Sequence, residues 1–260
     1  MMQIDAHQHF WNYDPVREAW IDHSMQVIRR DFLPEDLVPL LQAHDVAGCV
    51  AVQASQSEAE TEFLLGLAGA NGFIKGVVGW LDLLDPALPE RLGHYSKNPY
   101  LKGIRHVAQA EADDFLMRKD VQKGISQLTR FGLTYDILIF QQQLPAAIDL
   151  VRNLPDQPFI LDHLAKPAIS ECLDPVWKAN LHQLAQYPNV YCKLSGLVTE
   201  TRNFQWEPAE FTPFLEEALA AFGPDRLLYG SDWPVCLVSG PYGEPLNLVK
   251  TFIATLSGSE

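Results

Sequence analysis

Short apolar runs alternate with longer segments of mixed polarity along the whole chain of 260 residues. The runs contain few charged residues and are rich in β-branched and other apolar side chains, which is typical of strands buried on both faces. We predict eight such strands, at Met2–Ala6, Gly48–Gln53, Ile74–Leu81, Gly103–Val107, Thr134–Phe140, Phe159–Leu164, Val190–Leu194 and Leu227–Tyr229.

Apolar residues recur at helical spacing in several of the segments between these runs. Proline followed by acids marks a helix start, as in Pro34-Glu35-Asp36, and glycine marks a helix end, as in Phe131-Gly132. Helices are predicted at Pro34–His44, Glu58–Asn71, Phe115–Phe131, Pro145–Asn153, Val176–Tyr187 and Pro208–Phe222.

Eight β/α alternations in one chain of this length predict an α/β fold, a (β/α)₈ TIM barrel that forms a single domain over residues 1–260. An open doubly wound sheet is the alternative. Two segments lack the regular pattern. Phe10–Phe32, which is rich in aromatic and charged residues, is predicted to lie over the barrel mouth as a lid, and Trp233–Pro245 is predicted to form a second rim loop.

The composition limits the class of protein. The net charge of −14 argues against general nucleic-acid binding, which needs basic residues to neutralise phosphates. The chain contains no apolar stretch of the roughly 20 residues that span a bilayer, and its start does not resemble a signal peptide, so we expect a cytoplasmic protein that does not bind membranes. Free thiols are expected for the four widely spaced cysteines, Cys49, Cys172, Cys192 and Cys236.

Polar residues gather at the carboxyl ends of the predicted strands, where TIM barrels carry their active sites. His7 and His9 project from the same face of the first strand, because side chains alternate along a strand. His163 lies in the sixth predicted strand, and Asp232 follows the eighth. A single interior histidine is as often structural as functional, so the joint occurrence of these residues carries the inference. Further polar residues at strand ends are Gln53, Ser55, Ser57, Arg105, His106, Tyr135, Asp136, Asp162, Lys166, Lys193, Ser195 and Ser231.

Several longer motifs lie around these residues and together resemble the amidohydrolase superfamily, in its amidohydrolase 2 branch, and within it the lactonase-like group of sugar-lactone and pyrone-dicarboxylate hydrolases. The resemblance covers almost the whole chain. The motifs are Ile4-Asp5-Ala6-His7-Gln8-His9-Phe10-Trp11, Arg29-Arg30-Asp31-Phe32-Leu33, Leu101-Lys102-Gly103-Ile104-Arg105-His106, Leu161-Asp162-His163-Leu164-Ala165-Lys166-Pro167, Lys193-Leu194-Ser195-Gly196 and Tyr229-Gly230-Ser231-Asp232-Trp233-Pro234.

The resemblance implies a distorted barrel that hydrolyses an ester, amide or lactone, with Asp232 activating the water. Members with two metals carry a carboxylated lysine or glutamate on the fourth strand and a histidine on the fifth. This chain has Arg105-His106 and Tyr135-Asp136 there, so we expect at most one divalent ion. Its ligands would be His7, His9, His163 and Asp232, a nitrogen and oxygen set that suits Zn²⁺. A metal-independent site, in which the histidines donate hydrogen bonds to the substrate carbonyl, is the alternative.

The expected partner is a small-molecule lactone. Trp11 and Trp233, in the two rim segments, are predicted to stack on a sugar ring. Further substrate-binding residues are predicted at Arg105, His106, Tyr135, Lys166 and Lys193. A pyrone dicarboxylate needs several converging cations, of which only Arg105 is placed by the pattern, so a neutral aldonolactone is favoured. We also expect a homodimer, because two-fold dimers are the commonest assemblies.

Two other functions fit parts of the pattern. The first is metal-dependent, non-oxidative decarboxylation of an aromatic acid, but the motifs around His163 and Lys193 favour a lactonase. The second is a catalytically silent barrel that only binds a ligand. The joint presence of His7, His9, His163 and Asp232 argues against that function.

Overall fold

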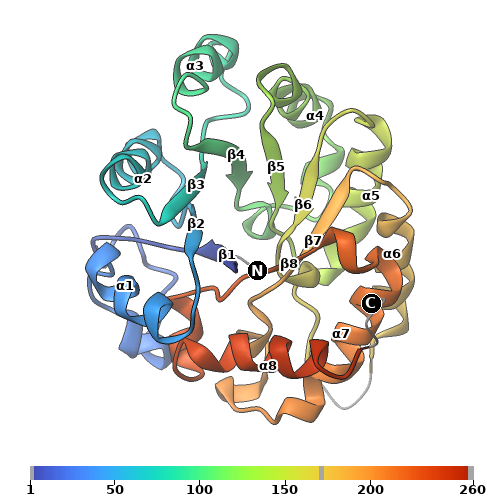
Figure 1. Cartoon of the computed structure of the whole chain (residues 1–260). Helices are drawn as coiled ribbons and strands as arrows, with labels where there is room; N and C mark the ends of the chain where they lie inside the picture. Colours follow the sequence, from blue (N-terminus) through green and yellow to red (C-terminus); the bar gives the residue numbers. More distant parts are fainter. Residues whose placement is uncertain (1–2, 170–172, 257–260) are drawn as a thin grey trace.

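The computed structural model describes residues 3–169 and 173–256, in which eight parallel strands follow one another around a barrel (Figure 1). Each strand pairs with the next in chain order. This order excludes the open doubly wound sheet, in which the strand order reverses. The strands are β1 (Ile4–Gln8), β2 (Gly48–Val52), β3 (Ile74–Gly79), β4 (Leu101–His106), β5 (Thr134–Ile137), β6 (Phe159–Leu161), β7 (Val190–Leu194) and β8 (Leu227–Tyr229).

The barrel is nearly closed by backbone contacts between the end of β1 and the segment after β8. The amide of His9 donates to the carbonyl of Trp233 over 2.7 Å, and the amide of Asp232 donates to the carbonyl of His7 over 2.8 Å. Gly230 permits this approach, since a Cβ at that position would lie 2.6 Å from the Cβ of His7. Residues far apart in the sequence, His7 and His9 at the end of β1 and Asp232 and Trp233 after β8, thereby lie together at the barrel mouth.

Helices surround the barrel and bury their apolar faces against it (Figure 1). In α7, for example, Phe211, Leu215, Ala218 and Phe222 recur at helical spacing and are buried. The helices are α1 (Pro34–Ala43), α2 (Glu58–Ala70), α3 (Leu88–Tyr95), α4 (Lys119–Ile125), α5 (Leu144–Asn153), α6 (Pro175–Ala185), α7 (Pro208–Phe222) and α8 (Gly243–Ile253).

The sequence pattern placed some elements wrongly. The helix predicted over Phe115–Phe131 is interrupted: only α4 is α-helical, and short 3₁₀ turns flank it. The helices α3 and α8 were not predicted, because proline and glycine lie inside the first and at the start of the second. The predicted rim loop Trp233–Pro245 therefore ends in the first turn of α8.

The segment Phe10–Phe32 packs closely on the barrel. Trp11 and Phe32 form an isolated antiparallel bridge, and both side chains are buried. Most of the remainder is irregular, with one 3₁₀ helix at His23–Ile28. Within the described residues, Cys49, Cys192 and Cys236 are buried free thiols, whereas Cys172 and the start of the first predicted strand, Met2, lie outside them. No helix in this part of the chain is both long and apolar enough to cross a membrane.

Candidate functional site

The four residues predicted to form the site converge at the barrel mouth; we refer to His7, His9, His163 and Asp232 as the histidine–aspartate group. The Nε2 atoms of His7 and His9 lie 3.2 Å apart. Oδ1 of Asp232 lies 3.2 Å from His9 Nε2, 3.7 Å from His7 Nε2 and 3.9 Å from His163 Nε2. All four residues are at least 95% buried, so their polar atoms face one another rather than bulk water.

The hydrogen bond of His9 to the backbone indicates its tautomer. Nδ1 of His9 lies 2.8 Å from the carbonyl oxygen of Val52, which can only accept, so Nδ1 carries the proton. In the neutral ring, Nε2 then holds a lone pair and faces the carboxylate of Asp232. Two acceptors at this distance repel unless a proton or a cation lies between them. This pair is therefore suited to bind a cation or an activated water.

A left-handed turn presents His163. The sixth strand ends at Leu161, three residues earlier than predicted, and the four residues His163 to Lys166 have φ between +50° and +59°. Non-glycine residues rarely adopt this conformation, because the Cβ crowds the following carbonyl oxygen. Tertiary contacts hold the turn: Ser195 Oγ lies 2.8 Å from His163 Nδ1, and Trp177 Nε1 donates to the carbonyl of Leu164 over 2.9 Å.

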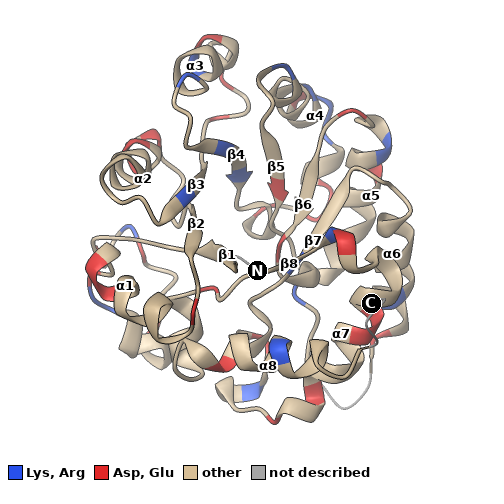
Figure 2. Cartoon of the chain, viewed as in Figure 1, with Lys and Arg blue, Asp and Glu red and all other residues tan. Residues whose placement is uncertain are grey.

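A second set of charged residues lies inside the barrel next to His7; we refer to Arg105, Asp136, Asp162 and Lys193 as the buried ion network. Figure 2 shows charged residues on strands of the barrel wall as well as on the outer helices. Lys193 Nζ lies 2.6 Å from Asp136 Oδ2 and 2.9 Å from Asp162 Oδ1. Arg105 Nη1 lies 3.0 Å from Asp162 Oδ2. The two positive and two negative charges balance.

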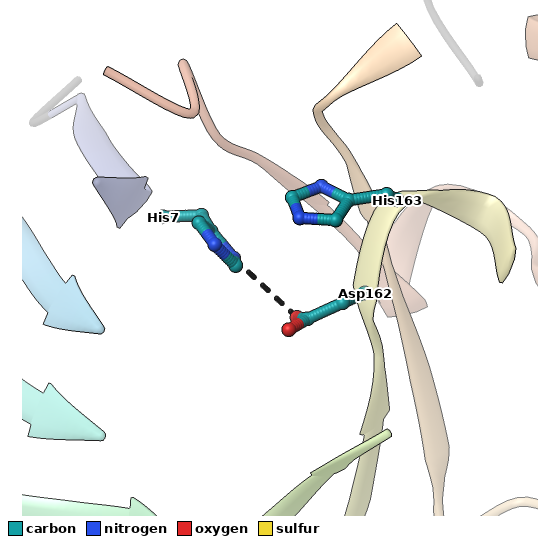
Figure 3. Close-up of side chains that lie close together, drawn as sticks. All are labelled: His7, Asp162 and His163. Atoms are coloured by element: carbon teal, nitrogen blue, oxygen red, sulfur yellow. Dashed lines mark ion pairs between the residues drawn. The ribbon is translucent and has the colours of Figure 1, made fainter. Parts of the chain in front are cut away.

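The network contacts the site through His7. Figure 3 shows the close contact between His7 and Asp162, with Nδ1 and Oδ1 3.4 Å apart, and the ring of His163 beside them. Lys193 Nζ lies 3.2 Å from His7 Nδ1, and Arg105 Nη1 lies 3.3 Å from His7 Nε2. A neutral imidazole has one acceptor nitrogen, so His7 accepts from only one of these two cations at a time. The network therefore holds the ring of His7 in position from both of its nitrogens.

These contacts change the interpretation of Arg105 and Lys193, which the sequence predicted to bind substrate. Their exposed fractions are 3% and 1%, and both pair with carboxylates of the protein. In the structure they lie inside the barrel, where they pair with Asp136 and Asp162 and contact His7. The sequence pattern placed Asp136 and Asp162 at strand ends but gave them no role, although a carboxylate in an apolar strand next to a predicted lysine or histidine was a usable signal.

Charge and burial set the protonation of the histidine–aspartate group. Burial alone would raise the pKa of Asp232, but His163, His9 and His7 outweigh it and hold that pKa below its ordinary value. Burial lowers the pKa of His163 to about 4 and that of His7 well below its usual range. At neutral pH the group therefore contains an ionised Asp232 and neutral imidazoles at His7 and His163.

The two predicted tryptophans and Tyr135 are almost fully buried. Trp11 and Trp233 are each 1% exposed; Trp11 Nε1 donates to the carbonyl of Arg30, and Trp233 packs edge-on against Phe32. The predicted stacking of these two rings on a substrate is not available in this conformation. Tyr135 precedes the interior Asp136 in β5, so its ring points to the helix side, where it packs against Phe159.

The two remaining predicted residues lie at the rim. Nε2 of His106 lies 3.0 Å from Glu111 Oε1, and Trp80 Nε1 donates to His106 Nδ1 over 3.3 Å. Lys166, at the end of the left-handed turn, pairs with Glu200 over 3.4 Å. Both predicted residues retain some exposure and lie at the carboxyl ends of strands.

The geometry of the histidine–aspartate group fits a metal ion. Ligand atoms about 2.0–2.1 Å from a tetrahedral Zn²⁺ lie about 3.3–3.4 Å from one another. The separations among His7, His9 and Asp232 are 3.2, 3.2 and 3.7 Å. Asp162 Oδ1 lies 3.4 Å from His7 Nδ1, the place of the carboxylate that often orients a ligating histidine. The residues present can therefore hold one ion.

Known proteins resemble the chain over its full length. The sequence model of the amidohydrolase family matches residues 4–260. An L-fucono-1,5-lactonase of Burkholderia multivorans is 40% identical, covering 100% of this chain and 91% of that protein. An L-fucono-1,5-lactonase of Burkholderia ambifaria is 35% identical, covering 93% and 83%. The crystal structure of an amidohydrolase from Burkholderia multivorans with bound Zn superposes with a TM-score of 0.95 at 40% identity, covering 100% and 94% of the two chains. This chain belongs to the amidohydrolase family.

Proposed function

We propose that this chain is a lactonase, a hydrolase that opens a sugar lactone by attack of water, with Asp232 as the general base. The observation that carries the proposal is the convergence of an ionised carboxylate with three imidazoles, at 3.2 to 3.9 Å, at the carboxyl ends of the barrel strands. Identity of 40% to an L-fucono-1,5-lactonase over the whole chain supports the reaction class.

The residues of the group divide the chemistry. Asp232 accepts a proton from water as the water oxygen bonds to the lactone carbonyl carbon. His163 donates from Nε2 to the carbonyl oxygen, on which negative charge develops; in this tautomer its Nδ1 accepts from the Ser195 hydroxyl, 2.8 Å away. When the ring C–O bond breaks, the proton held by Asp232 passes to the leaving alkoxide. Water and lactone thus yield one hydroxy acid.

One divalent ion is part of the proposal, with Zn²⁺ the best match to the ligands. His7, His9 and Asp232 would hold it, with His163 beside them. Such an ion supplies Lewis-acid polarisation and lowers the pKa of bound water from about 15.7 toward about 7. Exhaustive treatment with a chelator should abolish most of the turnover, and added Zn²⁺ should restore it. Full activity in protein shown to be metal-free by elemental analysis would contradict this part of the proposal.

The favoured substrate is neutral. The three cations predicted to face substrate, Arg105, Lys166 and Lys193, each contact a protein carboxylate, so they are already paired. A dicarboxylate would have to displace these pairs. A cytoplasmic location, a homodimer and the lack of nucleic-acid binding stay predictions of the sequence.

Acid release from a panel of lactones tests the function. The panel holds L-fucono-1,5-lactone, L-rhamnono-γ-lactone and 2-pyrone-4,6-dicarboxylate, with an enzyme-free control because lactones also open spontaneously. We expect turnover of at least one sugar lactone and none of the dicarboxylate. Turnover of the dicarboxylate alone would overturn the choice of substrate, and the absence of any lactone hydrolysis would overturn the function.

A further inference from the structure

The ion pair between Lys166 and Glu200 joins the two loops that build the His163 side of the site. Lys166 ends the left-handed turn, and its amide donates to the carbonyl of His163 over 2.7 Å. Glu200 follows Ser195, the residue that holds His163 Nδ1, within the loop after β7. The amide of Ile169 donates to the Glu200 carbonyl over 3.3 Å and ties the two loops together. The pair therefore links the turn that carries His163 to the loop that carries Ser195.

This pair differs from those of the buried ion network. The side chains of Lys166 and Glu200 are 18% and 19% exposed, whereas those of Lys193 and Asp136 are 2% and 0% exposed. The Nζ–Oε1 distance of 3.4 Å is longer than the 2.7–2.9 Å of a strong charge-assisted hydrogen bond. An ammonium has three donors and a carboxylate about four acceptor positions, so both groups keep capacity for a ligand.

The aromatic ring of Phe140 lies next to the Lys166–Glu200 pair. Phe140 follows β5 and is partly buried, and the centre of its ring lies 5.6 Å from Lys166 Nζ. Burial raises the pKa of Glu200; Lys166 offsets part of this rise, and the charge of Asp232 adds to it. The charge of Lys166 also contributes to the lowered pKa of His163. Lys166 and Glu200 therefore interact electrostatically with His163 and Asp232, respectively.

We propose that Phe140, Lys166 and Glu200 form a subsite that recognises the ring hydroxyls of a neutral sugar lactone. Glu200 accepts hydrogen bonds from neighbouring hydroxyls, Lys166 donates to a hydroxyl oxygen, and the ring of Phe140 packs against the C–H face of the sugar. Because the two charges balance, the subsite gives no net attraction to an anionic substrate. The assignment rests on the proposed lactonase function and adds the residues that select the substrate.

Selectivity between a hydroxylated and a bare lactone tests the subsite. We expect Glu200→Gln and Lys166→Met each to lower kcat/KM for L-fucono-1,5-lactone by about 10- to 100-fold, the range for hydrogen bonds to charged groups. For δ-valerolactone, which has no hydroxyls to bind, the loss should be clearly smaller in both variants. Glu217→Gln, which removes an acid paired with Lys178 and His182 away from the site, should leave both values unchanged.

Equal losses on the two lactones, or no loss on either, would overturn the subsite while leaving the lactonase function standing. Calorimetric binding of a hydroxylated 1,5-lactam, which mimics the ring but does not hydrolyse, separates the two claims. Binding weakened about tenfold or more by Glu200→Gln supports the subsite even if no lactone is turned over. Unchanged lactam binding contradicts it.

Discussion

The two sides of His7 are built on opposite principles. On the side of the histidine–aspartate group, His9 Nε2 and Asp232 Oδ1 are two acceptors that face each other over 3.2 Å. On the side of the buried ion network, every charge lies against an opposite charge, as in the 2.6 Å contact of Lys193 with Asp136. The polar atoms of the first side are available to bind a ligand, whereas those of the second side are paired with other residues of the protein. We infer that the histidine–aspartate group carries out catalysis, that the buried ion network positions it, and that the two meet at the ring of His7.

Removal of a network charge should give the largest effect on folding. Lys193→Met leaves two buried carboxylates without their ammonium, and breaking a buried pair from one side costs about 3–5 kcal/mol. Urea unfolding measures this loss. Lys178→Met is the matched control, because its pair with Glu217 is exposed and worth at most about 1 kcal/mol. Equal losses in the two variants would remove the distinction between the network and a surface pair.

Asp5 is a buried carboxylate whose hydrogen-bond donors carry no charge, so its contribution to the free energy of unfolding should fall as pH rises. Among the described residues, the donors to Asp5 are neutral, namely the amides of His7 and Ser231 and the hydroxyl of Tyr242, and burial raises its pKa to about 6. Its folded-state pKa exceeds the unfolded value of 3.8, so the folded state binds the proton more tightly. The stability contributed by Asp5 is therefore lost as pH rises from about 4 to about 6.

Asp5→Asn tests this sign, since asparagine keeps the acceptor but cannot ionise. Relative to the parent, the variant should gain up to about 3 kcal/mol in unfolding free energy between pH 4 and pH 7, because one pKa unit is worth about 1.4 kcal/mol. Denaturant titrations at the two pH values give the difference. If the unfolding free energy of the variant instead fell relative to the parent as pH rises, Asp5 would be stabilised in its ionised form.

A smaller effect is expected where backbone and site meet. Gly196 has φ +64°, and a Cβ there would lie 2.5 Å from Nδ1 of His163. Gly132 has φ +67° with open space around it, so it is the matched control. Both alanine variants should lose about 1–2 kcal/mol of stability from the left-handed backbone. Only Gly196→Ala should also lower kcat, by about tenfold or more, because it displaces His163. A normal kcat in Gly196→Ala would show that the position of His163 is not critical.

The sequence predicted the barrel and the histidine–aspartate group, because strand alternation and the shared edge of parallel strands bring His7, His163 and Asp232 together. It did not predict the roles of Arg105 and Lys193. Their pairing depends on which interior side chains share a layer, and that depends on register, such as the pairing of Arg105 with Asp136 across β4 and β5.

The turn that carries His163 was also beyond the sequence pattern. The residues Asp162 to Lys166 include no glycine, and leucine and alanine favour right-handed backbone, so local propensity contradicts four consecutive positive φ values. Contacts from β7 and α6, through Ser195 and Trp177, impose the conformation. Strain of this kind is concentrated at functional sites and is held by the surrounding structure.

The most direct test of the proposed hydrolase is kcat of Asp232→Asn on L-fucono-1,5-lactone, measured with the unfolding free energy of the same protein. Asparagine keeps the shape of the side chain but cannot accept the water proton. We predict that kcat falls by about 10³-fold, within the range for a general base, while the protein still folds and unfolds cooperatively; part of the unfolding free energy is lost, because the histidines stabilise the ionised carboxylate in the folded state. A variant that stays folded and turns over at the parent rate would contradict the role of Asp232 and with it the separation of catalysis from positioning.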